Sequence, residues 1–293
     1  SDLAVKAINR SRELVRNDPQ LRSLLPNMDV FAKLEDKTLS GEQTIDTIFS
    51  AYSGREAMGT RAYDVVNDSE DGHMKREYKP RYSAKTYGQI QDEIRAISNA
   101  WRHDPSVAVK RDEFVAILGF ASAEYFSLDC ATMYAQAVSV PLQSASAGAD
   151  LNDIFDRVEP VCLAASLDDL LAAIDLARHH ASVRSLVVFD IDLNVTGERA
   201  ALAGARQALE NSDVKVVTFS GLVETGKEFE FSFLPEHPEG NDRLALIIHS
   251  SGSTGVPKGA MITAGTVVQY WVGSPEKFPT ISVNQVIALG ERR

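Results

Sequence analysis

Cysteine is scarce in this chain, and its scarcity excludes the small secreted domains that disulfides stabilise. Only two cysteines, Cys130 and Cys162, occur among 293 residues. Both lie in apolar surroundings, where a buried and unpaired thiol is expected. No histidine–cysteine spacing matches a structural zinc site. This cysteine content fits a reducing compartment, and we expect a cytoplasmic protein.

Long apolar runs and an excess of basic residues are also missing. Without a run of 18 apolar residues, no helix is expected to span a membrane, and the N-terminus lacks the apolar core of a signal peptide. The net charge of −11 disfavours a nucleic-acid partner, because proteins that bind the phosphate backbone usually have a basic patch. The hydrophobic content of 44% is sufficient for a globular core.

Strand and helix patterns alternate through the middle of the chain. The segments between the apolar runs have the spacing of amphipathic helices about a dozen residues long, which implies parallel strands with right-handed crossovers. The sequence therefore predicts an α/β fold with a doubly wound, mainly parallel sheet flanked by helices. Short buried strands are predicted at residues 114–118, 138–140 (ended by Pro141), 161–164, 186–189 and 214–217.

Further elements are predicted on both sides of this alternation. Residues 1–43 read as a helical lead-in, and a polar turn at residues 67–72 predicts a β-hairpin. Thr86 is a plausible N-cap for the helix that follows. The alternation of Phe229, Phe231 and Phe233 indicates a strand face. The remaining predictions are a helix at 41–53, hairpin strands at 61–66 and 76–82, a buried strand at 244–248 and a helix beginning at 266–271.

A loop rich in glycine and hydroxyl side chains follows the apolar run at residues 244–248. Its sequence from position 250 is S-S-G-S-T-G-V-P-K-G. Such a loop can turn backbone N–H groups and hydroxyls toward an anion, and its lysine adds a positive charge. The natural ligand for this chemistry is the triphosphate of a nucleotide. The residue order matches neither the Walker A loop nor the G-x-G-x-x-G dinucleotide pattern.

This loop resembles the phosphate-binding loop of the adenylate-forming superfamily, which includes acyl-CoA ligases, luciferases and peptide-synthetase adenylation domains. The resemblance implies that the loop holds the β- and γ-phosphates of ATP, with Mg²⁺, while a carboxylate attacks the α-phosphorus. His249 stands where the family often has an aromatic residue, and we interpret it as a packing substitution. The resemblance assigns no catalytic residue and no metal ligand. It implies nucleotide binding by Ser250, Ser251, Gly252, Ser253, Thr254, Gly255, Lys258 and Gly259.

Other segments are similar to one branch of this superfamily, the carboxylic acid reductases. These segments are residues 118–125, 138–143, 186–190 and 259–261, and the similarity runs from about residue 45 to residue 261. The resemblance implies that residues 44–293 are the N-terminal part of the large lobe of an adenylation domain. The implied reaction is ATP-dependent activation of a carboxylic acid to an acyl-adenylate, before reduction to an aldehyde. A phosphopantetheine carrier domain and an NADPH-dependent reductase domain, implied for the full enzyme, are not among these residues.

The segment from Asn284 to Arg293 departs from that branch, because it contains neither the methionine nor the histidine of the corresponding pattern. The adenine-binding segment and the C-terminal catalytic lysine of the superfamily are not in this sequence either. We therefore expect this chain to be inactive by itself. Two alternatives stay open: an acyl-CoA ligase with coenzyme A as acceptor, and a non-catalytic remnant that binds a nucleotide or a partner without turnover.

Overall fold

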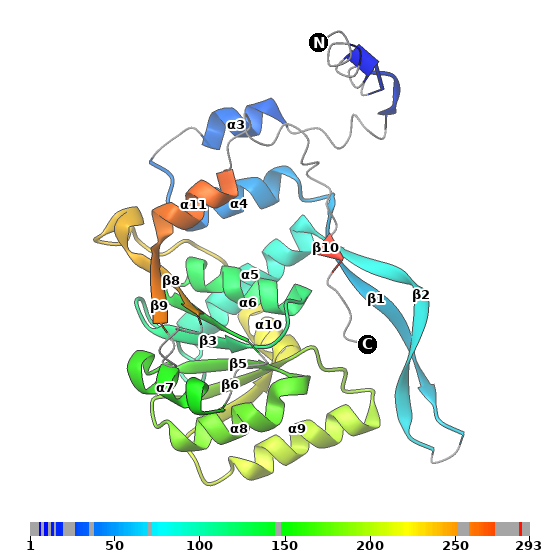
Figure 1. Ribbon diagram of the computed structural model, residues 1–293, viewed down its shortest axis with the longest axis vertical. Coiled ribbons are helices and arrows are strands. Elements are labelled where there is room, and N and C mark those ends of the chain that lie inside the picture. The colour runs from blue at the N-terminus through cyan, green and yellow to red at the C-terminus, as the bar shows by residue number, and fades with distance from the viewer. Residues whose placement is uncertain are drawn as a thin grey trace.

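The computed structural model describes residues 27–34, 38–69, 72–143, 148–250, 258–272 and 287–288, with scattered positions between 6 and 19. Within this part of the chain the strands form two sheets (Figure 1). The smaller sheet has the order β10-β1-β2, and its main feature is the long antiparallel hairpin of β1 (Glu56–Asn67) and β2 (Met74–Thr86). The predicted hairpin is confirmed, with strands that extend beyond the expected segments.

The larger sheet has seven strands in the order β7-β6-β5-β3-β4-β8-β9. The chain starts in the middle at β3, moves to β4, crosses to β5, β6 and β7 on the other side, and returns to β8 beside β4. The pairs from β7 to β8 are parallel, and β9 is antiparallel to β8. This reversal of direction confirms the predicted doubly wound sheet. The strands are β3 (Phe114–Leu118), β4 (Val138–Leu142), β5 (Cys162–Ser166), β6 (Ser185–Phe189), β7 (Lys215–Thr218), β8 (Leu244–Ser250) and β9 (Lys258–Thr263).

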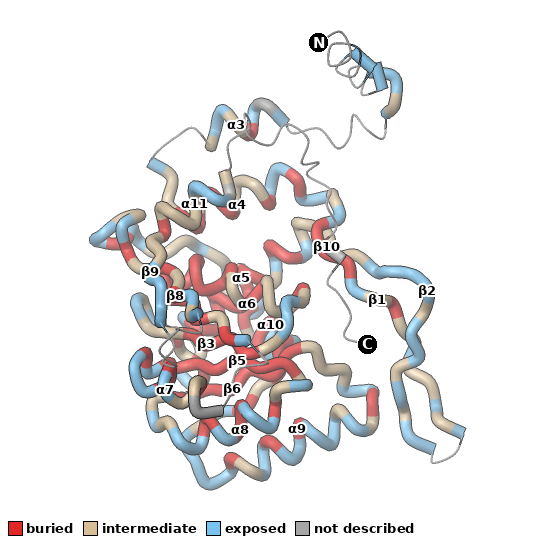
Figure 2. Tube along the Cα trace, viewed as in Figure 1, coloured by how far each residue is buried: buried red, intermediate tan, exposed pale blue. Residues whose placement is uncertain are grey.

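Helices cover both faces of the larger sheet, and the sheet separates the buried core into two clusters. Figure 2 shows that the buried residues are concentrated along the strands of this sheet. Val115 and Ile117 of β3 pack toward one face, whereas Ala116 and Leu118 pack toward the other. This alternation follows from the two-residue period of a strand and explains why the strands are apolar throughout. The first face is covered by α4 (Gly41–Ala51), α5 (Tyr87–His103), α6 (Ala123–Tyr134) and α10 (Phe219–Lys227), and the second by α7 (Gly148–Val158), α8 (Leu170–His179) and α9 (Thr196–Ala208).

Side-chain caps fix where several helices begin. The Thr86 hydroxyl accepts a hydrogen bond from the backbone N–H of Gln89, and the Gln89 side chain accepts one from Thr86. This capping box confirms the predicted N-cap of α5. Ser122 caps α6 through one hydrogen bond, which its hydroxyl accepts from the N–H of Tyr125. Short polar side chains at these positions satisfy backbone donors that have no partner inside the helix.

The structure corrects three local predictions. Residues 229–233 form no strand, because Phe231 and Phe233 instead pack on the ring of Tyr134. Pro141 lies inside β4 rather than ending it. Strand β8 pairs with β4 only at Ser139, so the N–H that proline lacks is not needed for pairing with β8 at position 141. Ile248, predicted to be buried, is 45% exposed.

Several short helices and strands that lie between the predicted elements were not expected from the sequence. Among them, α10 and β9 complete one helical layer and the end of the sheet. The last helix, α11, is confirmed and begins slightly earlier than predicted. The remaining described elements are α3 (Met28–Leu34), α11 (Ala264–Val272), β10 (Ile287–Ala288) and the 3₁₀ turns Leu167–Asp169 and Gly240–Asp242.

Candidate functional site

The parallel strands of the larger sheet all end at one edge, and the predicted phosphate loop starts there. Strand β8 ends at Ser250, and β9 begins at Lys258, which is the register partner of Ser250 in the antiparallel pair. In open α/β sheets, ligands bind beyond the carboxyl ends of the strands. The topology therefore places both ends of the loop where a ligand is expected.

Ser250 and Lys258 are both exposed at the base of this loop. Their pairing brings a hydroxyl and an ammonium group, eight positions apart in the sequence, to the same level of the β8–β9 hairpin. The remaining predicted phosphate-binding residues lie outside the described residues. They are Ser251, Gly252, Ser253, Thr254 and Gly255.

Gly259 is opposite His249 in the same hairpin, and the side chains of Ile247 and His249 occupy the space that a side chain at Gly259 would need. A Cβ atom at Gly259 would lie 2.7 Å from Cγ2 of Ile247 and 3.1 Å from Nε2 of His249. Glycine is therefore needed here because of close approach rather than because of its backbone freedom. The sequence predicted Gly259 as a ligand-binding residue, and the structure adds this packing reason.

His249 is half-buried on the same face of β8 as Ile247. Burial lowers the pKa of His249, and the positive charge of Arg157 lowers it further. Its Nδ1 atom is buried and has no hydrogen-bond partner within the described part of the chain. A neutral ring packed against Gly259 fits the packing role predicted for this histidine.

A second group of polar residues at the same edge was not found from the sequence. A cavity of about 210 Å³ lies where β3, β5 and β6 end. Arg76 of β2, Asp190 and Glu198 are among the residues that line it. The Arg76 guanidinium donates to Oε2 of Glu198 at 2.6 Å and to the carbonyl oxygen of Asp190 at 3.1 Å. More than a hundred residues separate Arg76 from both partners, so no local pattern could indicate this contact.

These contacts attach the hairpin to the segment that follows β6. The Tyr63 hydroxyl donates to Oδ2 of Asp192 at 3.0 Å, and the N–H of Met74 donates to the hydroxyl of Thr196 at 2.9 Å. Burial raises the pKa of Tyr63 to about 12, so its hydroxyl keeps the proton that it donates. Asp190 has a left-handed backbone with φ of 58°, which turns the chain sharply at the end of β6.

Glu124 at the start of α6 holds this turn from the other side. Its Oε2 accepts a hydrogen bond of 2.7 Å from the backbone N–H of Asp190. Burial raises the pKa of Glu124 to about 7; the Asp190 N–H opposes the rise, and the negative charge of Asp190 adds to it. A cavity of about 380 Å³ lies beside Glu124 and includes the Lys85–Glu93 ion pair of 2.6 Å. The edge thus contains a carboxyl group that titrates near neutral pH.

Metal-binding and thiol chemistry have no support in the described part of the chain. No group of three or more His, Cys, Asp or Glu side chains there is arranged to hold a metal ion, so Mg²⁺ is assigned no ligand. Cys130 and Cys162 are buried and unpaired, as predicted. Burial raises the pKa of Cys162 to about 11, which keeps this thiol protonated. None of the described helices combines the length and apolar character needed to cross a membrane.

A doubly wound parallel sheet with a glycine- and serine-rich loop after its strand β8 defines a nucleotide-binding α/β domain. The chain belongs to the AMP-binding enzyme family, whose model matches residues 66–286. This match includes the larger sheet, the helices from α5 to α11 and the predicted phosphate loop, whereas α4 lies before it.

Within this family, the chain is similar to carboxylic acid reductases, both in sequence and in structure. The chain is 33% identical over 280 residues to a carboxylic acid reductase of Mycobacterium tuberculosis, an alignment that covers 94% of this chain and 24% of the relative. It is also similar to the A-PCP didomain of the carboxylic acid reductase from Segniliparus rugosus in complex with AMP, with a TM-score of 0.86 and 33% identity over 90% of this chain and 37% of that one. The A domain of the Segniliparus rugosus enzyme, in complex with AMP and a co-purified carboxylic acid, gives a TM-score of 0.85 with 32% identity, over 91% of this chain and 42% of that one. The chain thus spans about a quarter of the length of the first curated relative.

Proposed function

We propose that this chain is part of an adenylation domain that uses ATP to convert a carboxylic acid into an acyl-adenylate. In the whole protein, this step would precede transfer to a phosphopantetheine carrier and NADPH-dependent reduction to an aldehyde. In this proposal residues 1–43 are a helical lead-in and residues 44–293 belong to the large lobe. We also propose a cytoplasmic location.

The observation that supports the proposal most strongly is the position of the phosphate loop. Ser250 and Lys258 sit at its two ends, on paired strands at the carboxyl edge of the sheet. Attack of a carboxylate on the α-phosphorus of ATP releases pyrophosphate, which has a large negative charge. An ammonium group, hydroxyls and backbone N–H groups at the loop lower the energy of that charge. Bound AMP and a carboxylic acid in the Segniliparus rugosus A domain agree with this chemistry.

A titration of this chain with ATP, followed by calorimetry, tests the role of the loop. Hydrogen bonds to charged groups contribute about 1.5–3 kcal/mol, so Lys258→Ala should weaken ATP binding by roughly 10- to 100-fold. Lys110→Ala, which removes an exposed lysine far from the loop in sequence, is the matched control and should leave the affinity unchanged. Equal affinities for Lys258→Ala and the unaltered chain would contradict the proposed site.

Acyl-CoA ligation is the alternative reaction, because ligases share the phosphate loop and the adenylate intermediate. The two reactions differ in the acyl acceptor. The natural protein that contains this chain should form aldehyde from a carboxylic acid with ATP and NADPH. Formation of an acyl-CoA thioester with coenzyme A, without aldehyde, would identify a ligase instead. ATP binding without release of pyrophosphate would identify a non-catalytic nucleotide-binding protein.

A further inference from the structure

The outer edge of the larger sheet is open at β7. Within the described residues β7 pairs with β6 alone, and it occupies the end of the strand order. The N–H of Lys215 donates to the carbonyl oxygen of Arg184, toward β6. Because successive residues of a strand direct their backbone groups to opposite sides, the N–H and C=O of Val216 point away from β6. An unpaired edge of this kind can pair with another strand.

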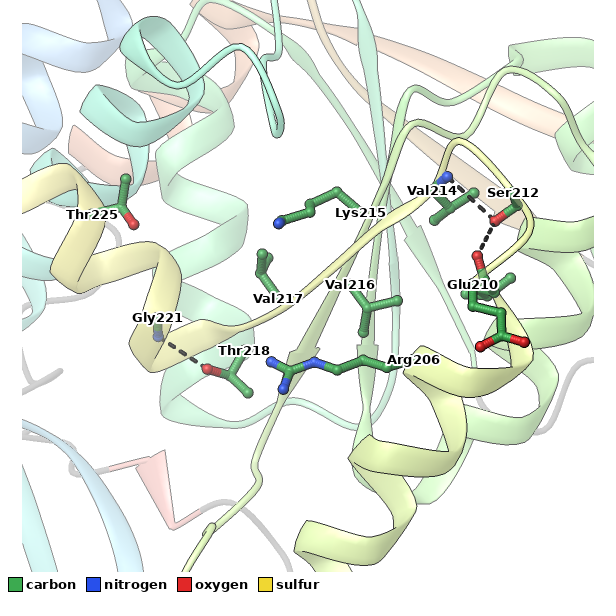
Figure 3. A pocket seen from close by; sticks show the side chains of 11 residues that line it. Arg206, Glu210, Ser212, Val214, Lys215, Val216, Val217, Thr218, Gly221 and Thr225 are labelled. Atoms are coloured by element: carbon green, nitrogen blue, oxygen red, sulfur yellow. Dashed lines mark hydrogen bonds between the residues drawn. The ribbon is translucent and has the colours of Figure 1, made fainter.

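A groove runs along this edge instead of a covering helix (Figure 3). Its volume is about 480 Å³, and β7 itself forms part of the lining. Arg206, near the end of α9, borders one side of the groove, and Gly221 and Thr225 of α10 border the other. The groove thus lies along a strand edge whose free backbone groups could pair with a further strand.

Two cations at the groove lack acidic partners. Neither Arg206 nor Lys215 forms an ion pair or a side-chain hydrogen bond in the described part of the chain, although the protein has a net charge of −11. Among the described residues that line the groove, Glu210 is the only acidic one. Figure 3 shows its carboxylate directed away from the Arg206 guanidinium. The groove therefore has a positive character on an acidic protein, and its charge is complementary to a negatively charged segment.

The two cations lie on opposite faces of the sheet and at opposite ends of β7. Lys215 begins the strand on the face where Val217 packs toward α10, whereas Arg206 comes from α9 on the face where Val216 packs. The Arg206 guanidinium points toward Thr218, at the end of the strand (Figure 3). Three residues of strand correspond to roughly 10 Å, and side chains three apart point to opposite faces.

We propose that the β7 edge binds an extended acidic segment of a partner protein, which adds to the sheet as another strand. Two acidic side chains three residues apart in that segment would face Lys215 and Arg206 on the two sides of the sheet. Backbone hydrogen bonds to Val216 supply affinity, and the two cations select the charge and spacing of the partner. This interaction surface is independent of the proposed adenylation site.

Synthetic peptides test the proposal on the unaltered chain. A fluorescently labelled Ac-TEVTEV-NH2, with its two acids three residues apart, should bind in a polarisation assay. Ac-TEVEVT-NH2, with both acids on one face, loses one exposed ion pair and should bind about two- to fivefold more weakly. Ac-TKVTKV-NH2 replaces both attractions by repulsions and should bind at least about tenfold more weakly. On binding of the first peptide, the amide of Val216 should exchange more slowly with deuterium, because it becomes a ladder donor.

Charge reversal gives a matched pair of variants. Arg206→Glu and Lys215→Glu should each weaken binding of the acidic peptide Ac-TEVTEV-NH2, and the double variant should bind the basic peptide more tightly than the acidic one. Lys110→Glu makes the same charge change at an exposed lysine outside the groove and should leave both affinities as they were. The urea midpoint of each variant confirms that the fold is intact.

Four results, all measured on the unaltered chain, would overturn the proposal. They are equal binding of the acidic and basic peptides, unchanged exchange at Val216, self-association of the chain through this edge in sedimentation, and displacement of the peptide by free glutamate at equal concentration. The last result would reduce the groove to a site for small anions.

Discussion

Glu124 makes the stability of this protein depend on pH near neutrality. Burial raises the pKa of its carboxyl group from the ordinary value of 4.5 to about 7. Between these two values the folded state binds the proton that the unfolded state releases, so the free energy of unfolding falls as pH rises. Each pKa unit corresponds to about 1.4 kcal/mol, which gives a loss of about 3 kcal/mol from pH 4.5 to pH 7 and no further loss above it.

The variant Glu124→Gln removes this titration and keeps the oxygen that accepts from the Asp190 N–H, which the carboxylate accepts at 2.7 Å. At pH 8 the variant should therefore be more stable than the unaltered chain, by up to about 3 kcal/mol. Near pH 5 the difference should fall to about 1 kcal/mol, because Glu124 is then neutral in the folded state and only its partial ionisation in the unfolded state remains. Urea unfolding at the two pH values measures both differences.

A control variant shows whether the effect belongs to Glu124. Glu236→Gln removes an exposed carboxyl group and should change the stability by less than about 0.5 kcal/mol at either pH. The reasoning is refuted if Glu124→Gln differs from the unaltered chain by the same amount at pH 5 and pH 8. Such a result would mean that Glu124 is already ionised in the folded state at pH 5.

Two further predictions concern glycines. A Cβ atom at Gly226 of α10 would lie 1.7 Å from the carbonyl oxygen of Ala96 in α5, so Gly226→Ala should lower the free energy of unfolding by about 3 kcal/mol or more. A Cβ atom at Gly204 of α9 would meet no atom within 4 Å, so Gly204→Ala should raise the free energy of unfolding by about 1 kcal/mol, because alanine favours the helix. Urea unfolding measures both variants, and a change of the same sign and size in both would contradict this account. Gly259→Ala should push Ile247 and His249 aside, cost about 1–3 kcal/mol of stability and weaken ATP binding. Unchanged ATP affinity in calorimetry, with Gly54→Ala as a control that has free space around its Cβ, would show that the packing of Gly259 does not affect the loop.

The alternation of elements could be predicted from sequence because it depends on local periodicity. The strands β3 and β6 lie within one residue of the predicted ends, and Thr86 caps α5 as expected. A strand covered on both faces needs only a short apolar run, and a cap needs only a hydroxyl before the helix. Neither signal depends on residues far away in the chain.

The alternation of Phe229, Phe231 and Phe233 shows where this local reasoning fails. The pattern fits a strand, but the segment pairs with no strand in the described part of the chain, and two of its rings pack on Tyr134. Strand β9 was missed for the opposite reason. It begins with Lys258 and Gly259, a weak strand sequence, and is held by its pairing with β8. Pairing therefore outweighs the intrinsic preference of a segment in both cases.

The sequence by itself determined the fold class and predicted the phosphate loop, because both inferences depend on the order of neighbouring residues. Only the tertiary structure decided which residues meet at the carboxyl edge of the sheet: the Ser250–Lys258 pairing, the close approach at Gly259 and, farther along the edge, the contact of Arg76 with Glu198. Arg76 and Glu198 are 122 positions apart. Contacts at such separations depend on the strand order and on the docking of the hairpin, and no local pattern in the chain records them.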